Sequence, residues 1–261
     1  MRNESVWLRT DDSGEKDLSF CPILLRGNME PVILHYKEAV FHEADACLIT
    51  LNEEENIKKC LDNIYNIVDG IIIIDGGSQD KTVEIIKSYN DIYKKIKLYI
   101  NDFFKSSNGI LGDQKNLCIS KSNSLWVLYM DPDEVLNDNL IKDFRKIIRE
   151  NQDKDVIDFI RYNYIDNKPE KLFEETLQLR LFKSFCRYVS TSHHSLTGWR
   201  NPDGYILLDK KYHMMHNKSK ERSEKNNRFY QSIDDKYPHK NWYLSREIKY
   251  EIKEHENERK D

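Results

Sequence analysis

The sequence contains no long apolar run and no compositional sign of a secreted or nucleic-acid-binding protein. None of its apolar stretches approaches the roughly 20 residues that a membrane-spanning helix needs. The first 17 residues are polar and charged, unlike a secretory signal. The five cysteines are widely spaced and form no Cys-x-x-Cys pair, which predicts reduced, buried thiols in a cytoplasmic protein. The net charge of −4 gives no indication of a generally basic surface.

Glycine is also scarce, and its spacing matches neither of the common phosphate-binding loops. Both the dinucleotide-binding pattern G-x-G-x-x-G and the P-loop pattern G-x-x-x-x-G-K-[ST] are missing. These absences argue against a nicotinamide dehydrogenase and against a P-loop phosphotransferase. The apolar residues, 39% of the chain, nevertheless cluster into strand-like and helix-like runs, which predicts one large folded domain with small appendages.

Strand and helix patterns alternate through the first half of the chain. Four short segments are typical of strands, at residues 46–51, 70–74, 97–100 and 125–130. Between them, apolar residues recur at helical spacing, as in the stripe from Ile57 to Val68. Asn52 is predicted to cap the first helix, with Glu55 as its capping-box partner. The alternation predicts β-α-β units and an α/β fold with a Rossmann-like, mostly parallel central sheet flanked by helices.

The pattern changes after Glu134, where a smaller antiparallel portion is predicted. A helix at 138–150 and a helix at 219–230 enclose strand-like runs at 156–164, 176–182 and 205–215. We therefore expect an N-terminal extension, a first, mostly parallel half, a second, smaller half and a charged C-terminal helical tail. Their predicted boundaries are 1–44, 45–150, 151–235 and 236–261.

Two carboxylates follow the strand at 125–130 with one residue between them. Asp131 and Asp133 point to the same side of an extended segment, and Pro132 keeps Asp131 out of helical space. Converging carboxylates repel each other unless a cation lies between them, and Mn²⁺ and Mg²⁺ prefer such oxygen ligands while bridging to a substrate phosphate. The spacing predicts a divalent metal site, although an acidic turn after a buried strand would have the same sequence.

Polar clusters follow each of the four strands, at the edge where ligands bind in open parallel sheets. The clusters comprise residues 50–54, 75–82, 112–116 and 131–134. Each also has an ordinary structural explanation, such as a helix cap at Asn52 or a tight turn at Gly76. Lys115 is notable because a cation at a helix start is unfavourable unless an anion lies nearby. The fold alone would place all four clusters at one edge.

The order and spacing of these clusters resemble glycosyltransferase family 2, whose members have the GT-A fold. The likeness covers roughly residues 45–230, and four segments carry it: LITLNE (48–53), IDGGSQDKT (74–82), GDQKN (112–116) and MDPDE (130–134). Small lipopolysaccharide-core glucosyltransferase-like members are most similar. In those members an Arg-Leu-Phe run, here residues 180–182, precedes a His-Glu pair, where this chain has His193 and His194.

The resemblance implies an inverting, metal-dependent transfer of a sugar from a nucleotide diphosphate sugar, with UDP-sugars the expected donors. It also implies that residues 45–150 are the nucleotide-sugar-binding half and residues 151–235 the acceptor-binding half. The implied nucleotide-binding residues are Thr50, Asn52, Glu53, Asp75, Gly76, Lys115 and Asp131. Within this set, Asp75 would contact the base and Lys115 the ribose or phosphate. The implied ligands of Mn²⁺ or Mg²⁺ are Asp131, Asp133 and His216.

The general base is less clearly implied, because His194 stands where the family has glutamate. A neutral imidazole can accept the proton of the attacking hydroxyl or thiol, and His193 or Asp203 are alternatives. The acceptor itself is left open among saccharides, lipid-linked saccharides, peptide side chains and modified nucleobases. The oligomeric state is likewise open.

Two other functions fit the same residues. A sugar nucleotidyltransferase also uses carboxylates at a sheet edge with Mg²⁺, and it would keep the nucleotide on its product. A non-catalytic nucleotide-sugar or glycan-binding protein would bind UDP and transfer nothing. The expected location is the cytoplasm, with attachment to the inner face of a membrane as an alternative.

Overall fold

The computed structural model describes residues 42–89, 94–102, 111–170, 175–189, 192–224 and 228. All of them belong to one compact unit that begins at His42. Residues 1–41 of the predicted N-terminal extension and the whole predicted charged helical tail lie outside the described residues. None of the helices described here is long and apolar enough to cross a membrane.

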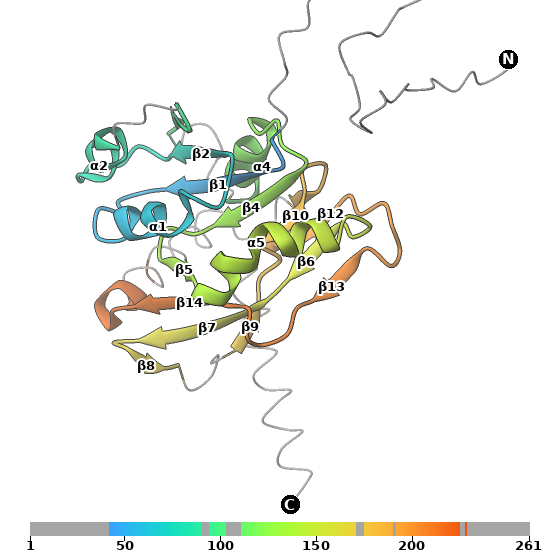
Figure 1. Ribbon diagram of the computed structural model, residues 1–261. Helices are drawn as coiled ribbons and strands as arrows, with labels where there is room; N and C mark the ends of the chain where they lie inside the picture. Colours follow the sequence, from blue (N-terminus) through green and yellow to red (C-terminus); the bar gives the residue numbers. More distant parts are fainter. Residues whose placement is uncertain are drawn as a thin grey trace, which may run out of the picture. The chain divides into compact units, whose positions relative to one another are not determined.

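A seven-stranded sheet forms the core of the described part of the chain (Figure 1). In sheet order, its strands are β13 (Tyr205–Leu207), β6 (Val156–Asp158), β10 (Leu181–Lys183), β4 (Trp126–Met130), β1 (Ala44–Thr50), β2 (Gly70–Asp75) and β3 (Ile96–Ile100). Strands β1 to β4 run parallel to one another, whereas β10 is antiparallel to both of its neighbours. The predicted mixed α/β architecture with a mostly parallel sheet is confirmed.

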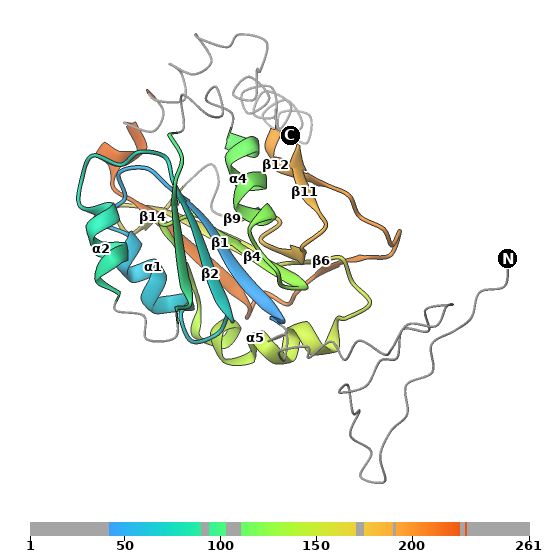
Figure 2. The same ribbon diagram turned by 90° about the horizontal axis from the view of Figure 1, so that it is seen from above.

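Helices cover both faces of this sheet. Figure 2 shows α1 (Ile57–Ile64), α2 (Thr82–Ser88) and α5 (Asp138–Glu150) on one side and α4 (Leu111–Ser120) on the other. Neighbouring residues of a strand point to opposite faces, so Leu48 packs with the first group of helices and Cys47 with α4. The central strands are therefore apolar on both faces, and polar side chains gather where the strands end.

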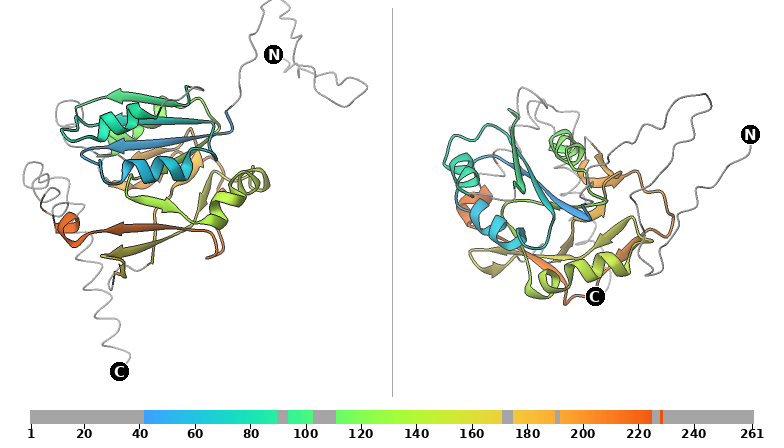
Figure 3. Two further views of the ribbon diagram at one scale, coloured as in Figure 1. Left: turned by 60° about the vertical axis from the view of Figure 1, so that its left-hand side comes forward. Right: turned by 45° about the horizontal axis from the view of Figure 1, so that its top comes forward.

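A second sheet lies beside the first (Figure 3). Its strands are, in order, β5 (Glu134–Leu136), β14 (His213–Lys218), β7 (Ile160–Ile165) and β8 (Lys168–Pro169), with β9 (Glu175–Leu177) also pairing with β7. The segment predicted as one strand at 156–164 is divided between the two sheets at Phe159. There the Asp158 carboxylate accepts the backbone N–H of Phe159, and the strand continues in the second sheet.

A separate hairpin, β11 (Arg187–Val189) and β12 (Ser192–Thr197), packs on the α4 side. Four cysteines fall in the described residues, and all four are free and buried: Cys47, Cys60, Cys118 and Cys186. The prediction of buried, unpaired thiols is confirmed for these positions.

Candidate active site

The loop after β2 is a closed polar network built around Asp75. The Asp75 side chain is fully buried, and its Oδ2 accepts bonds from the hydroxyls of Thr50 (2.8 Å) and Ser78 (2.6 Å). Its Oδ1 accepts the backbone N–H groups of Gly77 (3.0 Å) and Ser78 (2.8 Å). A carboxylate has about four acceptor positions, so these donors fill them. For Asp75 to contact a nucleobase, one of the donors would have to leave.

Asn52 belongs to the same network and does not cap a helix, contrary to the prediction. The first helix begins at Ile57, and Asn52 has a left-handed backbone with φ +57°. Its backbone N–H donates to Ser78 Oγ (2.9 Å), and its Oδ1 accepts the N–H of Gln79 (2.8 Å). The residue thus ties the end of β1 to the loop after β2. Gly76 adds a further tie by donating to the Thr50 carbonyl (2.7 Å).

The loop after β4 is held by charges instead. Arg180 is almost fully buried, and its Nη2 donates to both Asp131 Oδ2 and Glu134 Oε1. Arg161 also donates to Glu134 Oε1 (3.0 Å), and Glu134 Oε2 accepts the backbone N–H of Asp131 (2.9 Å). Burial raises the pKa of Asp131, but the charges of Arg180 and Lys115 outweigh it and hold that pKa well below its usual range.

Asp133 faces His216 across the end of this loop. His216 Nε2 lies 3.2 Å from Asp133 Oδ2, and both side chains are nearly buried. The other ring nitrogen, Nδ1, lies 2.9 Å from Asn163 Oδ1. The Nδ2 group of Asn163 donates to Thr176, so the amide oxygen faces the imidazole and Nδ1 is the donor. Nε2 is therefore free to present its lone pair to Asp133.

This pair fits a divalent metal ion. Burial lowers the pKa of His216, which favours the neutral ring. A neutral Nε2 and a carboxylate oxygen facing each other are two electron-pair donors aimed at one point, an arrangement that a cation stabilises. Within the described ranges no group of three or more His, Cys, Asp or Glu side chains could hold a metal. Mg²⁺ sites often have one or two protein ligands and are completed by phosphates and water.

The structure does not bring the three predicted metal ligands into one cluster. Asp131 is bound to Arg180, whereas Asp133 and His216 contact each other. Burial raises the pKa of Asp133, but the neighbouring His216 and the positive charges of Lys218 and Arg222 outweigh it and hold that pKa well below its usual range. An ionised Asp133 next to His216 is the geometry on which the metal prediction now rests.

Lys115 is buried between two aromatic rings. Its Nζ lies 4.5 Å from the ring centroids of both Tyr129 and Tyr188, where the π faces stabilise a cation. Burial lowers the pKa of Lys115 to about 8, and Asp131 opposes that shift. The ammonium group therefore lies on the α4 side of the sheet, where its charge stabilises the ionised form of Asp131.

Arg222 links the end of the second sheet to the first loop of the site. It pairs with Glu53 Oε2, and its Nε lies 3.8 Å from Asp133 Oδ2. Burial raises the pKa of Glu53 to about 7, Asp133 adds to the rise, and Arg222 opposes it. No sequence pattern singles out Arg222, because a lone arginine in a charged segment has no distinguishing neighbours.

Of the three general-base candidates, only Asp203 has a described side chain, and it lies away from this edge. Asp203 is exposed and precedes β13, whose Tyr205 aligns through β6 and β10 with the amino end of β4. Asp131 and Asp133 follow the carboxyl end of β4, so Asp203 lies at the opposite edge of the sheet. The backbone of His193 and His194 belongs to β12, and their side chains lie outside what the structure describes.

The chain belongs to glycosyl transferase family 2, because the sequence model described as "Glycosyl transferase family 2" matches residues 45–243. It is 24% identical over 213 residues to the SPbeta prophage-derived glycosyltransferase SunS of Bacillus subtilis, covering 78% of this chain and 46% of SunS. It is 29% identical over 189 residues to an "uncharacterized glycosyltransferase" of Rickettsia conorii, covering 67% of this chain and 64% of that protein. The chain therefore spans only part of the length of these relatives.

Among solved structures, residues 1–349 of S. aureus TarS in complex with UDP-GlcNAc have a similar fold. The TM-score is 0.52 at 17% identity, with 67% of this chain and 58% of that chain covered. The predictions of family 2 membership and of the GT-A fold are confirmed. The narrower likeness to lipopolysaccharide-core members, the domain boundaries and the site roles stay predictions.

Proposed function

We propose that this protein transfers a sugar from a UDP-sugar to an acceptor hydroxyl or thiol, with inversion at the sugar and with a divalent metal ion. The observation that carries the proposal is the Asp133–His216 pair at the carboxyl edge of the sheet, next to Asp131 and Lys115. Family membership and the fold shared with TarS, whose crystal structure holds UDP-GlcNAc, support it.

Asp133 and His216 would hold the ion, which would supply positive charge to the departing diphosphate. Lys115 adds a second positive charge on the α4 side. Arg180 holds the Asp131 carboxylate in a fixed position, where it would accept bonds from the ribose. The Asp133–His216 pair, Lys115 and Asp131 are each held by contacts with a different element, so they are preorganised before the substrate arrives.

In the transfer itself, the acceptor oxygen or sulfur forms a bond to the anomeric carbon from the face opposite the diphosphate. The bond between that carbon and the diphosphate breaks, and UDP leaves with the electron pair. The acceptor's proton passes to a base, for which His194 is the first candidate and His193 the second. We expect the reaction to take place in the cytoplasm.

A thermal-shift screen of nucleoside diphosphates and nucleotide sugars, with and without Mn²⁺, tests the proposal. A ligand that binds the native state raises the melting temperature, and UDP with Mn²⁺ should raise it most. Asp133→Asn should remove the Mn²⁺-dependent part of the rise while keeping the fold. An equal rise in this variant would contradict the metal assignment.

Product analysis then separates the alternatives. Release of UDP together with a glycosylated acceptor supports transfer. A product that retains the nucleotide would identify a nucleotidyltransferase, and tight UDP binding without turnover across a wide acceptor panel would identify a binding protein.

A further inference from the structure

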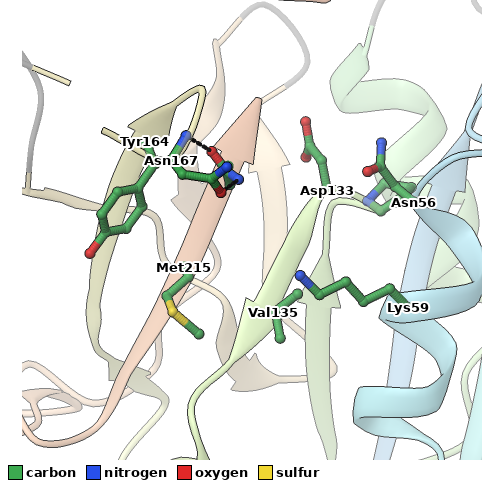
Figure 4. Close-up of a pocket in the computed structure, with 9 residues that line it drawn as sticks. Asn56, Lys59, Asp133, Val135, Tyr164, Asn167 and Met215 are labelled. Carbon is green, nitrogen blue, oxygen red and sulfur yellow. Dashed lines mark hydrogen bonds between the residues drawn. The ribbon is translucent and has the colours of Figure 1, made fainter. Parts of the chain in front are cut away.

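A cavity of about 330 Å³ opens next to Asp133, between α1 and the outer face of the second sheet (Figure 4). Asn56 and Lys59 of α1 and its preceding turn form one wall. Val135, Tyr164 and Met215 come from three strands of the second sheet. A volume of this size is at the lower end of the range for small-molecule sites.

The cavity is distinct from the predicted nucleotide site. Along β14, Met214 is fully buried and His216 faces Asp133, whereas Met215 points the other way and is 38% exposed. Of the residues predicted to bind the nucleotide or the metal, only Asp133 lines the cavity. Asp133 thus borders both the predicted metal site and this cavity.

The lining suits a sugar ring. Val135, Tyr164 and Met215 offer an apolar surface. Polar side chains surround it and offer hydrogen bonds: Asn56, Lys59, Asp133, Asn167 and Asn217. A pyranose has the same division, with C–H groups on its faces and hydroxyls around its edge. Polar groups that converge around an apolar surface are typical of small-molecule sites.

Lys59 adds a charge preference. In the part of the chain that the structure describes, no hydrogen bond or ion pair to Lys59 is found, whereas its neighbour Lys58 is bound to Asp62 at 2.7 Å. Figure 4 shows the Lys59 side chain extending across the cavity toward Val135. An ammonium that forms no ion pair beside an apolar floor favours an anionic group on the occupant, whereas the Asp133 carboxylate, which also lines the cavity, disfavours one beside itself.

We propose that this cavity is the acceptor subsite and that it takes an anionic saccharide, one that carries a carboxylate or a phosphate ester. The proposal rests on the proposed glycosyl transfer, because Asp133 is the group that places the cavity next to the donor diphosphate. The sugar ring lies over Met215 and Val135, its anionic group contacts Lys59, and its reactive hydroxyl faces the Asp133 end.

Methyl NMR of the full chain labelled with ¹³C-methyl methionine tests the subsite. Met215 lies in the cavity, whereas Met130 and Met214 are fully buried and serve as internal references. The Met215 signal is assigned with Met215→Leu. Glucuronate and glucose 6-phosphate are titrated as anionic probes, with glucose and inorganic phosphate as comparisons.

Both anionic sugars should shift the Met215 signal in a saturable manner, and glucose should bind roughly tenfold more weakly. Lys59→Gln should weaken the anionic probes by a similar factor, and Lys59→Arg should retain most of the affinity. Lys58→Gln, which removes the same charge one residue away, should bind like the unmodified protein.

Several results would overturn the subsite. They are an unmoved Met215 signal, equal affinity for glucose and the anionic sugars, equal losses in the Lys59 and Lys58 variants, or a response to inorganic phosphate as strong as that to glucose 6-phosphate. UDP binding is measured in the same samples. Loss of the subsite with UDP binding intact rejects only this inference, whereas failure to bind UDP rejects the proposed function.

Discussion

Two loops at the same edge of the sheet hold their carboxylates in different ways. Asp75, after β2, is surrounded by hydroxyls and backbone N–H groups, all from residues 50–78. Asp131, Asp133 and Glu134, after β4, are held by three arginines and His216, all from residues 161–222. The first loop is complete within its own β-α-β unit. The second is assembled only when the latter half of the chain has folded against it.

This difference predicts unequal costs of disruption, and the largest belongs to the charged loop. Arg180→Met should leave the carboxylate of Glu134 buried with only Arg161 beside it and should remove the partner of Asp131. We expect a loss of about 3–5 kcal/mol in the free energy of unfolding, since breaking a buried ion pair strands a charge. Urea unfolding measures it.

Arg149→Met is the matched control, because Arg149 is exposed near the end of α5. Its effect should stay within about 0.5 kcal/mol. Equal effects of the two substitutions would show that the charged network is not a stabilising feature of the second loop.

Glu53 connects the two loops, and its stability effect should depend on pH. Burial raises the pKa of Glu53 to about 7, above its ordinary value of 4.5. A raised carboxyl pKa contributes stability at low pH that is lost as the pH rises through 7. The free energy of unfolding of Glu53→Gln, relative to that of the unmodified protein, should therefore rise by about 2–3 kcal/mol between pH 4.5 and 8. A difference in stability between the two proteins that does not change with pH would contradict the raised pKa of Glu53.

The hydrogen-bonded loop should tolerate loss of charge better. In Asp75→Asn, the amide oxygen can keep the N–H groups of Gly77 and Ser78, while the hydroxyls of Thr50 and Ser78 turn to accept from the NH₂ group. The expected cost is about 1–2 kcal/mol, from the loss of charge-assisted bonds. A cost as large as that of Arg180→Met would remove the distinction between the loops.

The smallest expected effect concerns Lys115 and UDP affinity. Its pKa of about 8 means that the ammonium loses its proton between pH 7 and 9 in the free protein. Affinity for UDP should then fall severalfold over this range, measured by calorimetry. Lys115→Arg stays protonated and should show a flat profile. Parallel pH profiles for the two proteins would show that the Lys115 ammonium does not contribute to UDP binding.

The same comparison explains what the sequence could predict. The four parallel strands β1 to β4, the helix α5 and the turn after β2 follow from local patterns, such as the β-branched run at 70–74. Asn52 was misassigned because a residue in the left-handed region can tie a loop as readily as it caps a helix. The partners of Asp131 and Asp133 come from strands and a segment far along the chain, and no local pattern links Arg180 or Arg222 to them.

The buried thiols give the molecule a set of internal reporters. Cys60 lies beneath the Asp131 loop, Cys118 lies on the face of α4 that packs on the sheet, and neither is accessible in the folded protein. Burial raises the pKa of Cys60 well above its ordinary value, so the reactive thiolate is rare as well as hidden. Alkylation at each position must wait for a local or global opening. The rates of alkylation at Cys60 and Cys118 would therefore report how often the two faces of the sheet are uncovered, without the need to introduce a new cysteine.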